Sequence, residues 1–266
     1  MLTKESLRID SSAVKRHISN FLKVQIRVAG ASGVVLGISG GIDSSVVAAL
    51  CADALGSDKV LGLLLPSETT DPKDMDDARS LCEALRIEQE VVKIGPLVKT
   101  FAEVCPHFDA SDRVARGNLQ PRFRMLTLYS YANRLNRLVA GSGDRSELLV
   151  GYFTKYGDGG VDMLPIGDLY KTQVRQLAPF LGIPERVVQK ASSPGFWSGQ
   201  TAEGELGIKY EILDLVLHGL VDLKMEREDI CEALKISPET VDKVAWRIKN
   251  SEHKRSMPPS PQLRSI

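Results

Sequence analysis

The fold is decided by the stretch Val34-Val35-Leu36-Gly37-Ile38-Ser39-Gly40-Gly41-Ile42-Asp43-Ser44-Ser45. An apolar, β-branched run predicts a buried strand, the two adjacent glycines predict a tight turn, and the residues from Val46 to Leu55 predict a helix. A strand that turns tightly into a helix directs backbone N–H groups and the positive end of the helix dipole at an anion. Glycine also lets the backbone approach a phosphate closely. The stretch therefore predicts a phosphate-binding loop, and it is not a Walker loop because no Gly-Lys-Ser/Thr follows.

The polar residues of this loop favour a phosphate ligand over a plain turn, which is the alternative interpretation. Ser39, Ser44 and Ser45 supply hydroxyl donors, and Asp43 supplies a carboxylate that could hold Mg²⁺ beside a polyphosphate. The pattern resembles the pyrophosphate loop (Ser-Gly-Gly-x-Asp-Ser) of the ATP pyrophosphatase superfamily. That resemblance implies cleavage of ATP into AMP and pyrophosphate to activate a substrate.

Strands alternate with helices over the first part of the chain. We expect strands over 33–38, 60–65, 90–94 and 138–140, helices over 10–28, 46–55, 71–85, 97–104 and 118–135, and a loop over 106–117. This alternation predicts an α/β fold with a doubly wound, mostly parallel sheet flanked by helices. The C-terminal part is predicted to be helical, over 169–181, 185–190, 208–217, 227–234 and 238–249. We expect one domain over 1–266, with a flexible tail over 256–266.

Three segments with polar or glycine-rich sequences follow predicted strands. They are residues 39–45 after the first strand, 66–70 after the second and 141–147 after the fourth. Ligands of open parallel sheets bind outside the carboxyl ends of the strands. We therefore expect the three segments to meet at one ligand site.

Composition excludes several classes of protein. The 266 residues are 43% hydrophobic, and 34 basic residues balance 34 acidic ones, so no basic excess points to nucleic acid or to a membrane surface. The chain shows neither a run of transmembrane length nor a signal-peptide core. Its four cysteines are scattered, with no Cys-x-x-Cys pair, which favours reduced thiols. We expect a cytoplasmic protein that binds no nucleic acid and no metal other than transient Mg²⁺.

Further motifs resemble the NAD synthetase family over nearly the whole chain after residue 30. In order, they are Gly141-Ser142-Gly143-Asp144-Arg145-Ser146-Glu147, Gly151-Tyr152-Phe153-Thr154-Lys155-Tyr156-Gly157-Asp158-Gly159, Leu169-Tyr170-Lys171-Thr172-Gln173-Val174-Arg175, Gly195-Phe196-Trp197-Ser198-Gly199-Gln200-Thr201-Ala202-Glu203 and His253-Lys254. The glycine-rich, charged second motif is typical of a segment that orders when a ligand binds.

The resemblance implies an ammonia-dependent ligase that forms a carbon–nitrogen bond. The carboxylate of deamido-NAD⁺ attacks the α-phosphorus of ATP, pyrophosphate leaves, and ammonia displaces AMP to give NAD⁺. Because ammonium must lose a proton before the second step, Asp162 or another carboxylate is our hypothesis for the general base. Asp43 and Lys171 are the other catalytic residues that the resemblance implies, and Mg²⁺ is the implied metal.

The resemblance also implies binding residues, which we assign where a position of this chain matches a motif of the family. Those implied for ATP are Gly37, Ile38, Ser39, Gly40, Gly41, Ile42, Asp43, Ser44, Ser142, Lys171 and Ser193. Those implied for deamido-NAD⁺ are Arg122, Lys155, Asp162, His253 and Lys254, and those implied for the metal are Asp43 and Glu147. The resemblance also implies a homodimer, with the 118–135 helix as the candidate interface.

Taken singly, these residues have structural interpretations as well. Asp144 and Glu147 have the spacing of a helix capping box, Lys171 could lie on a solvated helix face, and His253-Lys254 could belong to an exposed tail. The chain also departs from the family pattern. Asp144 replaces an asparagine, and Ala202 replaces a common aspartate.

The sequence allows alternatives for the source of nitrogen and for the acceptor substrate. About thirty residues precede the first predicted strand, which is too few for an amidase domain, so we expect free ammonia unless a separate amidase supplies it. The alternative function is that of another ATP pyrophosphatase, an amidotransferase or thiolase with a different acceptor. A thiolase should carry paired cysteines and a basic extension, which this sequence lacks. A nucleotide-binding module without turnover should lack Asp43, Glu147 or Lys171, and all three are present.

Overall fold

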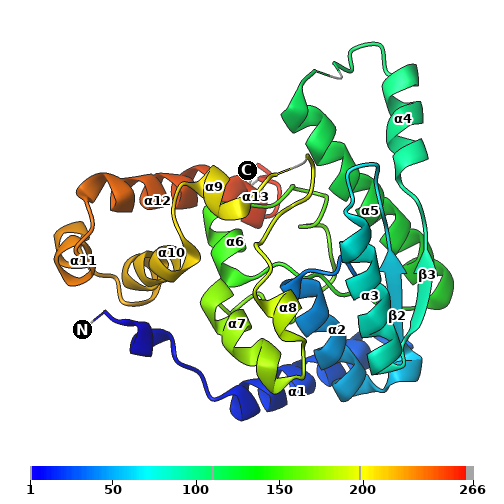
Figure 1. Cartoon of the computed structure of the whole chain (residues 1–266), viewed down its shortest axis with the longest axis horizontal. Coiled ribbons are helices and arrows are strands. Elements are labelled where there is room, and N and C mark those ends of the chain that lie inside the picture. The colour runs from blue at the N-terminus through cyan, green and yellow to red at the C-terminus, as the bar shows by residue number, and fades with distance from the viewer. Residues whose placement is uncertain (1, 110, 198, 262–266) are drawn as a thin grey trace.

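Four parallel strands form the sheet of the computed structural model, which describes residues 2–109, 111–197 and 199–261 (Figure 1). The strands are β1 (Val34–Gly37), β2 (Val60–Leu64), β3 (Glu88–Val91) and β4 (Leu138–Val139), in the order β3-β2-β1-β4. Val35 of β1 pairs with Leu61 on one side and with Val139 on the other. The predicted parallel, doubly wound sheet is confirmed, and the strand order reverses between β1 and β4.

Alternate residues of the strands face two different cores. Val34 and Leu36 pack against α1 (Ser11–Ala29), α2 (Ile42–Leu55), α3 (Pro72–Leu85) and α7 (Lys171–Phe180). Val35, Leu61 and Leu63 lie in the other core, with Phe123 and Leu128 of α5 (Arg113–Leu135). All five residues of β2 are buried, as expected for a parallel strand covered on both faces.

Three predicted boundaries were wrong by several residues. The helix predicted over 46–55 begins four residues earlier, as α2 starts at Ile42. The third strand was predicted over 90–94, but β3 ends at Val91. Its side chains are mostly exposed because it lies at the sheet edge. The strand therefore lacks the apolar run from which its bounds could be predicted. The helix predicted over 118–135 begins at Arg113 within the predicted loop. Asp112 caps it by accepting hydrogen bonds from the N–H groups of Val114 and Ala115, both at 2.9 Å.

The C-terminal part is helical, as predicted, and encloses a core of its own. α8 (Glu185–Val188) still packs against the α/β core through Val187. The helices that follow are α9 (Ala202–Leu206), α10 (Tyr210–Leu217), a π-helical turn (His218–Asp222), α11 (Arg227–Leu234), α12 (Pro238–Asn250) and α13 (Glu252–Arg255). Tyr210, Leu213, Ile230 and Val241 are fully buried there, together with Leu7 of a short 3₁₀ turn (Lys4–Leu7). In Figure 1 these helices lie beside the α/β layers, and α7 lies between the two parts.

Short connections complete the described chain. A 3₁₀ turn (Ser57–Lys59) leads into β2, α4 (Gly95–Val104) follows β3, and α6 (Arg145–Val150) follows β4. Of the predicted tail, residues 257–261 are exposed and lie in no helix or strand, whereas 262–266 lie outside the described residues.

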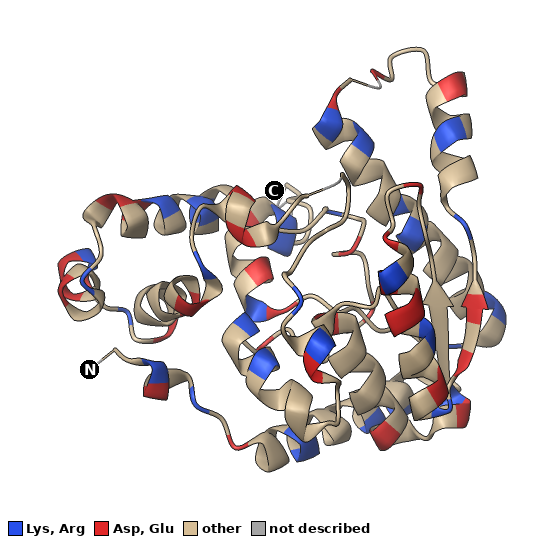
Figure 2. Ribbon diagram, viewed as in Figure 1, with Lys and Arg blue, Asp and Glu red and all other residues tan. Residues whose placement is uncertain are grey.

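Charges of both signs are interspersed over the helices, which agrees with the balanced composition (Figure 2). Within the residues that the structure describes, no helix has both the length and the apolar character needed to cross a membrane.

Candidate active site

A cavity of about 720 Å³ lies at the carboxyl ends of the strands. Its wall includes Gly37 at the end of β1, Pro66 after β2 and Ser142 after β4. The three segments that the sequence predicted to meet, 39–45, 66–70 and 141–147, all contribute residues to this wall. Topology thus places the predicted phosphate loop in the wall of this cavity.

The phosphate loop is held by hydrogen bonds among its own residues. The Ser44 hydroxyl accepts a hydrogen bond from the N–H of Ser39 at 3.2 Å and donates to the carbonyl of Gly41 at 3.1 Å. Gly41 is the N-cap of α2, and Ile42, Asp43 and Ser44 in the first turn line the cavity. The positive end of the α2 dipole therefore faces the cavity, where it favours a bound anion.

Gly40 cannot be replaced without strain, and we expect Gly40→Ala to destabilise the protein measurably. Its φ is +76°, and an added Cβ would lie 2.2 Å from the carbonyl oxygen of Asp74 in α3. The left-handed conformation alone costs about 1 kcal/mol for alanine, and the overlap adds about 1–3 kcal/mol. Urea unfolding measures the loss.

Gly30 provides the matched control for this prediction. It has a similar φ of +61°, but no atom lies within 4 Å of its added Cβ. Gly30→Ala should therefore lose only the conformational part, about 1 kcal/mol. Equal losses at the two positions would show that the contact with α3 does not constrain the loop.

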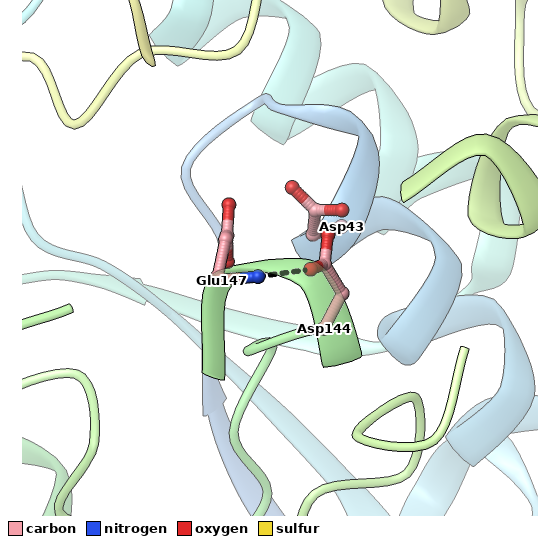
Figure 3. Close-up of side chains that lie close together, drawn as sticks. All are labelled: Asp43, Asp144 and Glu147. Carbon is pink, nitrogen blue, oxygen red and sulfur yellow. Dashed lines mark hydrogen bonds between the residues drawn. The ribbon is translucent and has the colours of Figure 1, made fainter. Parts of the chain in front are cut away.

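Lys171 lies at the centre of three carboxylates beneath the phosphate loop. Its Nζ is 2.6 Å from Asp43 Oδ2, 2.9 Å from Asp144 Oδ2 and 2.9 Å from Glu147 Oε1. The side chains of Lys171 and Asp144 are fully buried, whereas those of Asp43 and Glu147 are 19% exposed. Figure 3 shows the three carboxylates converging from α2 and from the start of α6. The cluster contains one cation and three potential anions at the floor of the site.

Burial and charge act against each other in this cluster. Burial raises the pKa of both Asp144 and Glu147. Burial by itself would lower the pKa of Lys171, but Asp144, Asp43 and Glu147 outweigh it and hold that pKa well above its usual range. Lys171 is therefore charged at neutral pH.

The same cluster fits a divalent cation. Asp43, Asp144 and Glu147 each offer an oxygen atom, and these oxygens lie within 4.8 Å of one another. Asp43 Oδ1 is buried and has no hydrogen-bond partner among the described residues. Mg²⁺ prefers carboxylate oxygens as ligands, so an unpaired, buried carboxylate oxygen is a suitable donor for it.

Asp144 caps a helix, as its spacing to Glu147 suggested, and it also contacts Lys171. Its Oδ1 accepts a hydrogen bond from the Glu147 N–H at 2.8 Å and caps α6, while its Oδ2 faces Lys171. Asp144, one of the residues by which the chain departs from the family pattern, thus lies at the centre of the site.

A buried network fixes the backbone of Lys171 from the opposite side. The Lys171 N–H donates to the Ser146 hydroxyl at 2.9 Å, and that hydroxyl donates to Asp214 Oδ1 of α10 at 2.6 Å. Asp214 Oδ2 accepts from the N–H of Thr172 at 2.8 Å. The C-terminal helices therefore hold the first turn of α7 through a single carboxylate.

Asp214 should make stability depend on pH. Burial raises the pKa of its carboxyl from 3.8 to about 6. The folded protein thus retains this proton at pH values where the unfolded chain has lost it. The resulting stabilisation is present below about pH 4 and is lost as the pH rises through about 6, by about 3 kcal/mol in total.

Asp214→Asn removes this titration while keeping an oxygen acceptor. In urea unfolding at pH 4, 5, 6 and 7, the free energy of unfolding of the variant should fall less steeply between pH 4 and 6 than that of the original protein. Parallel curves for the two proteins would contradict the prediction.

The residues predicted to bind ATP gather at the cavity. All of them except Gly40 and Lys171 contribute to its wall: Gly37, Ile38, Ser39, Gly41, Ile42, Asp43, Ser44, Ser142 and Ser193. Lys171 is fully buried and reaches the site through its partners Asp43 and Glu147, whereas Gly40 packs against α3.

The residues predicted to bind deamido-NAD⁺ lie outside the cavity wall. Lys155 Nζ donates to the carbonyl of His253 at 2.5 Å, and Arg122 donates to the carbonyl of Lys155 at 3.4 Å. Lys254 Nζ donates to the carbonyls of Gly151 and Phe153 at 2.7 and 2.8 Å. These four predicted residues thus form one group around α13 and the loop that follows α6.

Asp162 lies apart from that group. Its Oδ1 accepts from the Tyr129 hydroxyl at 2.9 Å, and its Oδ2 accepts from the N–H of Val139 in β4 at 2.7 Å. Both oxygens therefore have partners within the fold. Its role as a general base stays a prediction.

Sequence reasoning missed two cations in the cavity wall, Arg124 and Lys190. Arg124 Nε donates to the carbonyl of Leu65 at 3.1 Å, and burial lowers the pKa of its guanidinium to about 10. Other arginines precede and follow it in α5, so no spacing distinguishes it. Lys190 lies in a segment without regular structure and had no signal in the sequence.

Comparisons with known proteins agree with this geometry. A family model described as NAD synthase matches residues 14–258. The NH3-dependent NAD⁺ synthetase of Pyrobaculum aerophilum is 49% identical over 96% of this chain and 94% of its own. The solved structure of NMN synthetase from Francisella tularensis is 34% identical, with a TM-score of 0.85 over 96% of this chain and 100% of its own. The NH3-dependent NAD synthetase from Campylobacter jejuni is 29% identical, with a TM-score of 0.80 over 96% and 100% of the two chains.

Proposed function

The chain belongs to the NAD synthase family, and from that premise we propose that it is an ammonia-dependent NAD⁺ synthetase. It amidates the nicotinate carboxylate of deamido-NAD⁺ with ammonia and consumes ATP. The observation that carries this proposal is the contact of Lys171 with Asp43 and Glu147 at the phosphate loop. It combines a buried cation, a helix N-terminus and a carboxylate set on one wall of a cavity.

The reaction has two steps. The nicotinate carboxylate attacks the α-phosphorus of ATP, the α–β phosphoanhydride bond breaks, and pyrophosphate leaves with the electron pair. Ammonia then attacks the acyl carbon of the adenylate, AMP leaves, and one proton is released. A carboxylate is already a nucleophile, so the first step needs no general base.

The protein contributes charge stabilisation to the first step. Negative charge grows on the departing pyrophosphate. The first turn of α2 supplies N–H donors on that side of the cavity, and the buried Lys171 ammonium adds positive charge behind Asp43 and Glu147. Donors that are already oriented stabilise a transition state without reorganisation. Mg²⁺ held by Asp43 and Glu147 would neutralise phosphate charge in the same place.

We assign the group formed by Arg122, Lys155, His253 and Lys254 to deamido-NAD⁺ and expect a homodimer that completes this part of the site. The exposed Leu126 of α5, at 59% exposure, supports that helix as the interface. Light scattering with parallel activity measurements tests the assembly. A fully active monomer would refute it.

A smaller acceptor is the second candidate substrate. The likeness to NMN synthetase at a TM-score of 0.85 favours testing nicotinate mononucleotide beside deamido-NAD⁺. We assign the cavity of about 720 Å³ to ATP, and we therefore expect discrimination between the two acids to arise outside it.

The deciding experiment supplies ATP, Mg²⁺ and either acid, with ammonium or glutamine as nitrogen source. We expect NAD⁺ to form from deamido-NAD⁺ and ammonium, with one AMP for each NAD⁺. Preferred turnover of the mononucleotide would reassign the acceptor. If ATP is cleaved but neither amide forms, the assignment of ATP cleavage would stand and the proposed acceptor substrate would be refuted.

A further inference from the structure

Lys190 contacts the phosphate loop from the side of α3 and α8. Its Nζ donates to the carbonyl oxygen of Gly40 at 3.0 Å, and to Asp74 Oδ1 and Asp77 Oδ2 at 2.7 Å each. The residue follows α8 directly and lines the cavity. It therefore connects the loop to α3 at the edge of the site.

The contact with Gly40 determines which way one peptide group faces. In a planar trans peptide, the carbonyl of one residue and the N–H of the next point in opposite directions. Lys190 holds the Gly40 carbonyl on the α3 side, so the Gly41 N–H points to the other side. Gly41 lines the cavity, and its N–H donates to the Ser39 hydroxyl oxygen at 3.3 Å within the loop, a contact that fixes the same peptide from its other end. A flipped peptide would present a carbonyl oxygen to an anion instead.

Glycine at this position leaves the peptide free to rotate unless a contact prevents it. Gly40 and Gly41 both lack a Cβ, and glycine populates both signs of φ readily. Lys190 is the described side chain that donates to the Gly40 carbonyl. Asp74 and Asp77 lie one turn apart on α3 and keep the ammonium in place.

We propose that Lys190 is a positioning residue, which holds the Gly40–Gly41 peptide so that its N–H, and not its carbonyl oxygen, lies on the side of the loop proposed to bind the phosphates of ATP. The proposal rests on the proposed ATP-cleaving function. It differs from direct binding of a phosphate by the Lys190 ammonium, which predicts other effects of the neighbouring aspartates.

Lys190→Met tests the proposal, with Arg186→Met as matched control. Arg186 also pairs with Asp77, at 2.8 Å, but makes no described contact with the loop. We expect Lys190→Met to weaken the binding of ATP and to slow pyrophosphate release by roughly 10- to 100-fold, because small displacements at a reacting centre have effects of this size. The KM for deamido-NAD⁺ should stay within about twofold, since its predicted residues lie elsewhere. Arg186→Met should match the original protein.

Two further variants separate positioning from direct contact. Lys190→Arg keeps a donor and should restore most of the ATP affinity. The double variant Asp74→Asn/Asp77→Asn releases the ammonium, so positioning predicts weaker binding of a non-hydrolysable ATP analogue by calorimetry. Direct phosphate contact predicts equal or tighter binding.

Each outcome supports or overturns the proposal. Wild-type kinetics of Lys190→Met, or tighter analogue binding by the double aspartate variant, would overturn it. If Lys190→Met fails to fold, Lys190→Arg and the aspartate variant still decide. If the original protein itself cleaves no ATP, the proposed function fails before any variant is compared.

Discussion

Lys171→Met should abolish turnover and destabilise the protein. We expect the rate of pyrophosphate release to fall by about 10³-fold, which is the size of effect that one preorganised charge beside a reacting centre has. The variant also leaves Asp43, Asp144 and Glu147 without their shared cation. An uncompensated buried carboxylate costs about 3–5 kcal/mol. Single-turnover kinetics and urea unfolding measure the two effects.

The loss of stability should depend on pH in a defined direction. Without the lysine, the buried carboxylates retain their protons to higher pH in the folded state than in the unfolded chain. Stability is then present at low pH and is lost as the pH rises. We therefore expect the difference in free energy of unfolding between variant and original protein to be larger at pH 8 than at pH 5.

A double variant separates folding from catalysis. Lys171→Met/Asp144→Asn removes one positive and one potential negative charge, and asparagine still caps α6 as well as aspartate does. Its stability should recover, while its activity should not. Lys15→Met is the control, because Lys15 forms a 2.7 Å pair with the partly exposed Asp53, and such pairs contribute about 0–1 kcal/mol. Recovery of activity by the double variant would show that Lys171 acts only on the fold.

Asp43→Ala should abolish adenylation and leave the fold intact. Asp43 Oδ1 is the unpaired oxygen that we assign to Mg²⁺, and its loss should lower pyrophosphate release by about 10³-fold, since metal ions and oriented charges supply several kcal/mol to such transition states. Lys171 keeps Asp144 and Glu147 as partners at 2.9 Å each. The melting temperature should therefore change little.

The control for Asp43→Ala comes from the same helix. Asp53→Ala in α2 removes an aspartate whose side chain is 45% exposed and whose partner is a surface lysine. Its kinetics and its Mg²⁺ dependence should match those of the original protein. Near-normal pyrophosphate release by Asp43→Ala would refute the assignment of the metal.

The predicted elements were confirmed best where burial requires a run of apolar residues in the sequence. β1 and β2 are covered on both faces, so apolar runs identified them. The edge strand β3 has no such apolar run, because most of its side chains are exposed. The start of α5 has none either, because the single residue Asp112 caps it. Their observed bounds differ from the predicted ones by two to five residues.

By itself, the sequence determined the strand–turn–helix of residues 34–55, the parallel sheet and the residues from which a carboxylate–lysine cluster is built. Local patterns suffice for these features, since turns, helix starts and buried strands depend on neighbours in the chain. Only the tertiary structure decided that Asp144 faces Lys171, that Asp214 caps α7 and that Lys190 holds Gly40. These contacts join segments that are distant in sequence. Burial and charge at such points depend on how the helices pack, which no local pattern contains.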